Sequence, residues 1–332
     1  MKRSTYPILA IAVAAACQDA TAPRGPTVSP TEAVPSAAQV AVGNNLFAVV
    51  GLAGNLIAGN GVTSVTASGF GTYEVTFNRN VTGCAYVATN TNAYSQALTI
   101  YTAGGHSSVN GVYVETKNQG GGLTAGPFNL VVSCNNTFPF AVVDYNGNLV
   151  RSSGGVSLSA FGGVYELTFS QNIAPCAYIA TVADPSNGIV VNPSGAYTGT
   201  APAPSTVLIE TKNPGGGLQN GIPFHLVLIC AGTPRSGYAV VKSTGGFARG
   251  SPPGGNVQHP STGHYTINSP FAIGSCAKLL TRGSKDTSPP FNPTTVEIGA
   301  SSTNTSFRAE TRELLFFGGA FFDETFHTAV VC

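Results

Sequence analysis

The sequence predicts an all-β protein of three tandem modules, each a small antiparallel β-sandwich of jelly-roll or immunoglobulin-like kind. Three observations carry this prediction. One stretch occurs three times, six cysteines fall two to each copy, and short apolar runs alternate with glycine-rich turns without an amphipathic helix period. The three copies of the stretch are Gly71–Cys84, Gly163–Cys176 and Gly263–Cys276.

The composition is poor in charge and rich in turn-forming residues. Only 9% of the 332 residues are charged, against roughly 25% in an ordinary soluble domain. The chain contains 41 glycines and 22 prolines, and its net charge is +1. Nucleic acids and acidic lipid surfaces require clustered positive charge, so we expect no nucleic-acid partner.

The N-terminus has the features of an export signal. Lys2 and Arg3 precede an apolar run, Tyr6–Ala16, that is too short to span a bilayer. The run ends in the letters AAAC, which resemble the lipobox of bacterial lipoproteins. The resemblance implies that residues 1–17 are a signal peptide and that a lipid on Cys17 anchors the protein to a membrane. The alternative is ordinary cleavage at an Ala-x-Ala site, which leaves a free thiol.

The segment after Cys17 is expected to be a tether. Residues 18–44 are rich in Ala, Pro, Thr and Ser and show no hydrophobic period, which is typical of a flexible linker. By the same resemblance to lipoproteins, Gln18 rather than Asp after the cysteine implies sorting to the outer membrane or cell surface. The sequence therefore predicts an exported, lipid-anchored protein.

The three modules are predicted at residues 45–134, 138–230 and 237–332. Each opens with a short apolar run that predicts a buried strand, namely Leu46–Val50, Phe140–Val143 and Tyr238–Val241. In the repeated stretch that follows, alternation places Tyr73, Val75 and Phe77 on one face of a strand.

Three further strands carry recurring motifs, and each module is expected to contain seven or eight short strands in all. One begins at the first cysteine, as in CAYVAT, the next carries the motif ETK or ETR, and the last ends at the second cysteine, as in FHLVLIC. Between the first two lies a variable segment where binding specificity is expected, at Asn90–Asn110, Val182–Ser205 or Arg282–Ser306. The motif set resembles tandem modules of bacterial exported proteins, a resemblance that carries no known function.

The six module cysteines are expected to form one disulfide per module. Six cysteines allow 15 pairings, and the repeat makes pairing within each module the most economical, as Cys84–Cys134, Cys176–Cys230 and Cys276–Cys332. An exported protein meets an oxidising compartment, which permits disulfides. A metal site is the alternative, but no CxxC or HxxxH spacing supports it, so we expect neither a metal nor another cofactor.

The most suggestive polar pattern is the acid–base pair of each ETK or ETR segment. Residues two apart on a strand share a face. One interpretation is a surface ion pair, or charges that protect an edge strand from aggregation. The other is a repeated contact for a glycan or a protein partner. The pairs are Glu115 with Lys117, Glu210 with Lys212, and Glu310 with Arg312.

No catalytic arrangement is expected. Glu74 and Glu115 are able to meet across strands as the two carboxylates of a glycosidase, but repeat three lacks the first of them and the chain has no tryptophan. His225 and His327 share one repeat position with Asn129, which is typical of a solvent-facing strand site. No Ser/His/Asp arrangement is indicated, so the protein is not expected to be an enzyme.

Repeat three differs from its siblings by an apolar segment, Leu314–Phe322, where they have a polar glycine turn. Exposed, such a cluster exceeds what a monomeric surface normally tolerates. We expect a neighbouring module or a partner molecule to cover it. The linkers between modules are only a few residues long, so adjacent modules are expected to touch.

The leading hypothesis for function is a cell-surface lipoprotein that acts as a binding or adhesive protein for a glycan or a protein ligand. The alternative is a structural envelope or matrix protein whose repeats associate with copies of itself. An exported hydrolase is the least favoured of the three.

Overall fold

The computed structural model of the chain describes residues 45–91, 98–134, 137–183, 195–200, 203–213, 215–232, 235–251, 256–283, 294–313 and 320–332. These residues belong to one compact unit, Gln39–Cys332. The signal peptide, Cys17 and the tether, expected over residues 1–44, lie outside the described residues. No helix within the described ranges is long and apolar enough to cross a membrane.

The described residues form strands and no helix, so the all-β prediction is confirmed. Repeat one contains β1 (Leu46–Val50), β2 (Leu56–Asn60), β3 (Val62–Gly69), β4 (Thr72–Phe77), β5 (Ala85–Asn90), β6 (Thr99–Gly104), β7 (Gly111–Lys117) and β8 (Phe128–Ser133). Repeat two contains β9 (Phe140–Val143), β10 (Leu149–Ser152), β11 (Val156–Phe161), β12 (Val164–Phe169), β13 (Cys176–Ala183), β14 (Gly195–Thr200), β15 (Thr206–Lys212) and β16 (Phe224–Cys230). Repeat three contains β17 (Ser236–Val241), β18 (Phe247–Ser251), β19 (Val257–Ser261), β20 (His264–Asn268), β21 (Ala277–Arg282), β22 (Thr294–Ser302), β23 (Ser306–Glu313) and β24 (Phe326–Val331).

The strands pair in the same order in each repeat. One layer, which we call the inner layer, has the order β2-β1-β8-β5, and this order recurs as β10-β9-β16-β13 and β18-β17-β24-β21. The other, the outer layer, has the order β3-β4-β7-β6, and it recurs as β11-β12-β15-β14 and β19-β20-β23-β22.

These layers make up five sheets rather than six, because β13 of repeat two joins β6 of repeat one. The two strands pair in parallel at Val182↔Tyr101 and Ala183↔Thr102. β13 reaches β6 because it is longer than its counterparts β5 and β21. In every repeat the first strand pairs with the last. The immunoglobulin order ABED and CFG contains no such pair, so neither the immunoglobulin-like nor the jelly-roll type is confirmed.

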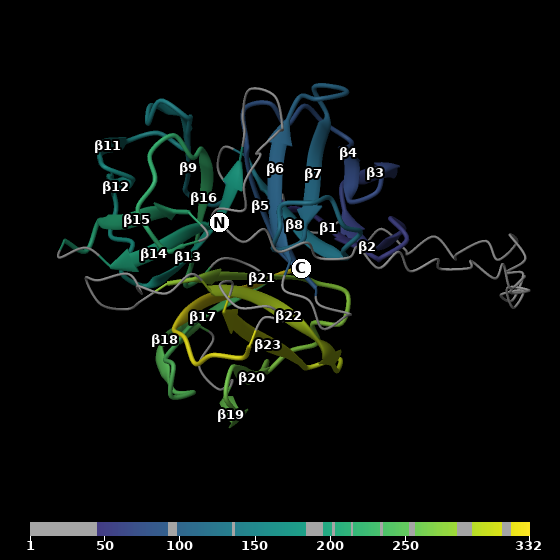
Figure 1. Ribbon diagram of the computed structural model, residues 1–332, viewed down its shortest axis with the longest axis vertical. Helices are drawn as coiled ribbons and strands as arrows, with labels where there is room; N and C mark the ends of the chain where they lie inside the picture. Colours follow the sequence, from purple (N-terminus) through teal and green to yellow (C-terminus); the bar gives the residue numbers. More distant parts are fainter. Residues whose placement is uncertain are drawn as a thin grey trace, which may run out of the picture. The chain divides into compact units, whose positions relative to one another are not determined.

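Each repeat has a core between its two layers, and the three inner layers share a fourth core. In β1, Leu46, Ala48 and Val50 face the core of repeat one, whereas Phe47 and Val49 face the shared core. A strand buried on both faces has a continuous apolar sequence, which explains why the opening runs show no alternation. In Figure 1 the strands of the repeats form three groups, and β5, β13 and β21 lie where the groups meet.

A threonine on each of these three strands binds the backbone of a neighbouring repeat. Thr181 Oγ1 accepts a hydrogen bond from Ala88 N at 2.8 Å and donates one to Ala88 O at 3.1 Å. The same two bonds join two further pairs, Thr281 with Ala180 and Thr89 with Leu280. Repeat two thus binds repeat one, repeat three binds repeat two, and repeat one binds repeat three. The contacts close a ring, and adjacent modules touch as expected.

His225 and His327 are buried in these contacts, so the prediction that they face solvent is wrong. Both lie on the last strand of an inner layer, which packs against another repeat. His225 Nδ1 accepts a hydrogen bond from Tyr86 N at 2.7 Å, and His327 Nδ1 accepts one from Tyr178 N at 3.0 Å. Each imidazole also packs on that tyrosine, tilted at a centroid distance of 4.8 Å for His225 and stacked at 5.0 Å for His327.

An arginine from the same repeat as each histidine completes the contact. Arg151 lies over the Tyr86 ring and donates from Nε to the carbonyl oxygen of Cys84 at 3.3 Å. Arg249 repeats both contacts in the next repeat, with 3.0 Å to the carbonyl oxygen of Cys176. The neighbour therefore supplies a cation and an imidazole that hold one tyrosine between repeats.

The contact between repeats three and one uses a different set of residues. Lys278 stands where the other contacts have tyrosine, Asn129 where they have histidine, and Ala58 where they have arginine. Asn129 Oδ1 accepts a hydrogen bond from Lys278 N at 3.4 Å, and Lys278 Nζ donates to Cys276 O at 3.2 Å. The first cysteine carbonyl of every repeat thus meets a cation, but in repeat three that cation belongs to the same repeat.

The disulfides are those predicted from the repeat, Cys84–Cys134, Cys176–Cys230 and Cys276–Cys332. Each joins the start of β5, β13 or β21 to the end of the last strand. The separations of 50, 54 and 56 residues correspond to roughly 4 kcal/mol each in the chain-entropy account. Disulfides persist in oxidising compartments, which is consistent with an exported protein.

Replacing His225 by alanine should lower the free energy of unfolding by about 2–4 kcal/mol, because the change removes a packed ring and leaves the buried Tyr86 N–H without an acceptor. His225→Asn should cost less, since Asn129 fills the same position in repeat one. Urea unfolding of both variants measures the difference. Equal losses would show that the hydrogen bond contributes little.

The same variants differ in their pH dependence. Burial, with a smaller contribution from Arg151, lowers the pKa of His225 well below its ordinary value of 6.5. Below about pH 6.5 the histidine of the unfolded chain binds a proton that the buried His225 does not bind. The contribution of His225 to the free energy of unfolding is therefore fully present above about pH 6.5 and is lost as the pH falls. Between pH 7 and 5, His225→Asn should lose about 2 kcal/mol less than the unmodified protein.

Candidate functional site

The ETK and ETR segments lie on β7, β15 and β23, each of which is paired on both sides. The three ion pairs form as expected, with Lys117–Glu115 and Lys212–Glu210 at 2.8 Å and Arg312–Glu310 at 2.7 Å. They are buried pairs, however, and not surface pairs or edge guards. The cations are only 4%, 4% and 6% exposed, because these strands lie inside the outer layers.

The glycine-rich loops that follow these strands fold back onto them. Lys117 pairs through its backbone with Leu123, Lys212 pairs with Leu218, and Arg312 pairs with Phe321. In repeat three the Arg312 guanidinium lies 3.9 Å from the centroid of the Phe321 ring. Backbone bridges therefore hold the loop ends against the outer layers, and in repeat three the Arg312 side chain adds a contact to its loop. Of the apolar segment Leu314–Phe322, residues 314–319 lie outside the described residues.

Repeat one carries a further acid cluster on the exposed face of its outer layer. His106 Nδ1 is 3.6 Å from a Glu74 oxygen, and the imidazole stacks on Tyr113 with ring centroids 4.4 Å apart. Tyr113 Oη donates to Glu115 Oε1 at 2.9 Å. Burial raises the pKa of Glu74, an effect that the Ser107 N–H and His106 oppose.

This cluster does not form the two-carboxylate cleft of a glycosidase. Tyr113 stands directly opposite Glu74 in the β4–β7 register and lies next to Glu115, so a phenol separates the two acids. Gly111 leaves the space in which the Glu74 carboxylate lies, since a Cβ there would collide with it. In repeat two the equivalent acid, Glu166, points to solvent and lies opposite Leu208.

Repeat three has a second carboxylate where repeat one has an aromatic ring. Glu297 stands opposite Glu310, at the position that Tyr101 takes opposite Glu115. Arg312 contacts both acids, with Nε 3.3 Å from Glu297 and Nη2 2.7 Å from Glu310. Burial raises the pKa of Glu297 well above its ordinary value, and Arg312 opposes the shift. The sequence patterns did not identify Glu297 as a site residue. The only signal was that this acid aligns with Tyr101 of repeat one.

His264 joins the same cluster and brings a serine, an acid and an imidazole together. Ser261 Oγ is 3.0 Å from His264 Nδ1, and His264 Nε2 is 4.0 Å from Glu310 Oε1. The longer distance exceeds a hydrogen bond, and the Phe321 ring covers the imidazole at a centroid distance of 3.8 Å. The arrangement is therefore packed against an apolar ring and is not a proton relay to a nucleophile.

The remaining polar groups suggest no metal centre. His259 Nε2 pairs with Asp323 Oδ1 at 2.8 Å, and its ring stacks on Tyr265. Within the described part of the chain, no three His, Cys, Asp or Glu side chains are grouped so as to hold a metal ion.

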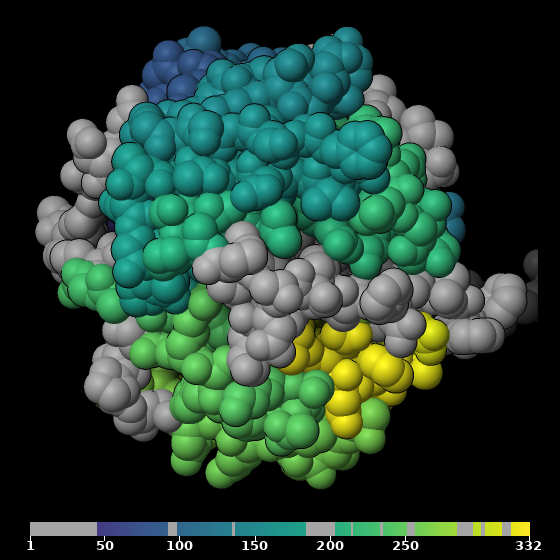
Figure 2. Space-filling model, turned by 90° about the vertical axis from the view of Figure 1, so that its left-hand side faces the viewer, coloured from purple at the N-terminus to yellow at the C-terminus, as the bar shows by residue number. Residues whose placement is uncertain are grey.

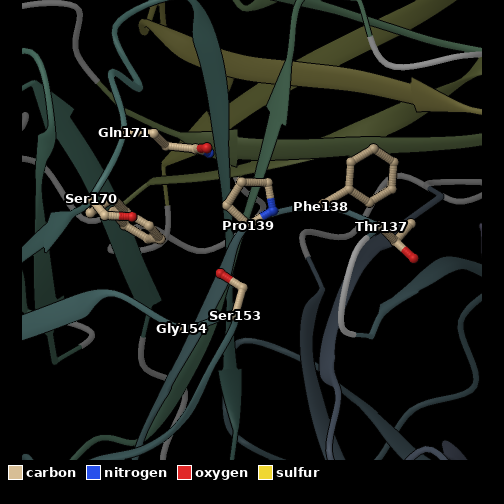
Figure 3. Close-up of a pocket in the computed structure, with 8 residues that line it drawn as sticks. Thr137, Phe138, Pro139, Ser153, Gly154, Ser170 and Gln171 are labelled. Atoms are coloured by element: carbon tan, nitrogen blue, oxygen red, sulfur yellow. The ribbon is translucent and has the colours of Figure 1, made fainter.

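A cavity of about 270 Å³ opens at one end of the core of repeat two. Figure 3 shows Ser170 and Gln171 on one side of it, with Pro139 and Ser153 opposite. These residues come from the start of β9, the turn after β10 and the end of β12. The sequence patterns did not indicate this site, although proline at position 139 in place of the leucine of repeat one was a visible signal.

Comparisons with known proteins identify no relative. No protein-family model matches the chain. Neither a curated protein nor a solved structure matches it significantly. A function therefore has to be inferred from the residues and their arrangement.

Glu297→Gln should keep or raise the free energy of unfolding at pH 7, by up to about 3 kcal/mol, because it removes a carboxylate whose charged form burial disfavours. A group with a raised native pKa stabilises the fold below its unfolded pKa and loses that contribution as the pH rises. The gain should therefore vanish near pH 4. Urea unfolding at both pH values measures it.

Glu310→Gln is the matched control. It removes the acid that contacts both Arg308 and Arg312, so it should destabilise the protein by about 3 kcal/mol at pH 7. If both variants lost stability equally, Glu297 would be an ordinary ion-pair partner.

Proposed function

We propose that the protein is an exported, lipid-anchored binding or adhesive protein of the outer membrane or cell surface, with a glycan or a protein as ligand and no catalytic activity. Its scaffold is three tandem β-sandwich modules, each made of one inner and one outer layer. The repeated layer orders and the three separate cores support this division. Nucleic acid is not a partner, because the chain lacks clustered positive charge.

The observation that carries this proposal is a set of large apolar side chains at hairpin tips. Phe70 is 70% exposed in the β3–β4 turn, and Phe161, the last residue of β11 before the equivalent turn, is 88% exposed. Leu123 and Leu218, on the glycine-rich loops of the same repeats, are also exposed. Figure 2 gives the space-filling surface of repeat two in teal, beside repeat three in green to yellow.

Repetition distinguishes these tips from ordinary exposed residues. Single apolar side chains on a surface need no explanation, but here one phenylalanine lies in the β3–β4 turn of repeat one and another lies directly before the equivalent turn of repeat two, one position earlier in the alignment. Thr116 N donates to Gly71 O and Thr124 N donates to Thr116 O, so backbone hydrogen bonds tie the first tip to the neighbouring loop. An aromatic ring on such a support buries a large contact area at low entropic cost, which favours a role in binding.

Phe70→Ser combined with Phe161→Ser should reduce ligand binding at least tenfold and change stability by no more than about 0.5 kcal/mol. Binding is measured on a glycan array and on immobilised envelope proteins. Val150→Ser, which removes an exposed apolar side chain from strand β10, is the control and should bind normally. Unchanged binding by the double variant would contradict the proposal.

The same tips suit the alternative of a structural protein that associates with copies of itself. Sedimentation equilibrium separates the two functions. Self-association of the unmodified protein that the double variant abolishes, together with no binding to glycans or other proteins, would favour the structural function.

The anchor is tested separately. Radiolabelled palmitate should enter the unmodified protein and not Cys17→Ala, because lipid transfer requires the thiol of that cysteine. Mass spectrometry of the mature N-terminus provides the control. An unmodified Cys17, or a mature chain that begins after it, would contradict lipid anchoring.

A further inference from the structure

The cavity of repeat two lies between its two layers, at the end of the core where β9 begins and β12 ends. Its volume of about 270 Å³ is near the lower limit of ligand pockets. Phe169 and Pro139 provide apolar walls, while Ser153, Ser170 and Gln171 provide hydroxyl and amide groups at the solvent-exposed rim. Figure 3 shows Pro139, Ser153, Ser170 and Gln171 around the opening.

The cavity exists because repeat two has a smaller residue than repeat one at one position. Leu46 of repeat one aligns with Pro139, and the Leu46 side chain reaches Gly61, where it closes the end of the core. In repeat two the aligned glycine, Gly155, meets the Ser170 side chain, and no atom of Pro139 is among its nearest neighbours. The opening is therefore a specific difference between two otherwise similar repeats.

The lining is uncharged. Of the described residues that line the cavity, none is Asp, Glu, Lys, Arg or His. An ionic ligand would lose its hydration without gaining a counter-charge there. A neutral ligand with hydroxyl groups on its edge and C–H groups on its faces matches a pocket of hydroxyl and amide groups around proline and phenylalanine. A single pyranose ring has this chemistry and this size.

We propose that this cavity binds one neutral sugar ring of a glycan ligand, with the ring against Pro139 and Phe169 and its hydroxyls toward Ser153, Ser170 and Gln171. The inference rests on the proposed binding function and assigns it a ligand class and a site. Repeat one cannot bind a sugar in the same way, because Leu46 occupies the equivalent space.

Saturation-transfer difference NMR on the purified protein tests the proposal, with glucose, galactose and N-acetylglucosamine as neutral probes and glucuronate as the charged one. A neutral sugar should give a signal with a dissociation constant on the order of 1 mM, and glucuronate should bind at least tenfold more weakly. Pro139→Leu introduces the residue of repeat one and should abolish the signal. Ser159→Ala, an exposed change on β11 outside the cavity, should leave it unchanged.

A second variant keeps the test valid if Pro139→Leu does not fold. Ser170→Ala with Gln171→Ala removes rim polar groups from exposed positions and should weaken binding at least tenfold. The proposal is overturned if no neutral sugar binds, if glucuronate binds best, or if the variants bind like the unmodified protein. If Phe70 and Phe161 prove necessary for glycan binding while Pro139→Leu binds normally, the proposed function stands and the cavity is not its site.

Discussion

The shared core of the three inner layers is the constraint on which the rest of the structure depends. An inner layer is apolar on both faces, as Ile179, Val227 and Ile229 illustrate on the shared side of repeat two. One face is covered within the repeat, and only two other repeats can cover the second. The chain supplies them in sequence through short linkers. The threonine ring, which includes Thr181, then satisfies backbone groups of β5, β13 and β21, the end strands of the inner layers, that would otherwise be buried without partners.

The residues at the contacts also determine which repeats meet. The tyrosine contact joins a tyrosine of one repeat to an arginine and a histidine of the next. Repeat two carries a tyrosine as well as an arginine and a histidine. Repeat one carries only the tyrosine, Tyr86, and repeat three carries only the arginine and the histidine. The ring closes between repeats three and one through Lys278 and Asn129. Burial lowers the pKa of Lys278, so a second cation beside it would be costly. An arginine-bearing repeat packed against repeat three would supply that cation, whereas repeat one, which has Ala58 at that position, does not.

The strands and disulfides could be predicted from the sequence, because they depend on local spacing that recurs in each repeat. Tyr73, Val75 and Phe77 lie in the core as the alternation indicated. The environments of His225 and of the Glu115–Lys117 pair could not be predicted, because alternation reveals which residues share a face but not what that face packs against. The cavity at Pro139 was missed for a related reason, since its volume depends on side chains from three separate segments.

The positions that differ among the repeats are the candidates for the proposed binding function. The three threonines of the ring and the apolar character of the shared core recur in all three repeats, whereas other positions differ. Repeat one has Tyr101 where repeat three has Glu297, repeat two has Pro139 where repeat one has Leu46, and repeat three has Thr262 where repeat one has the exposed Phe70. An adhesive that bound three identical ligands would keep one contact set in every repeat. This divergence instead favours a single ligand or partner that meets different repeats with different chemistry.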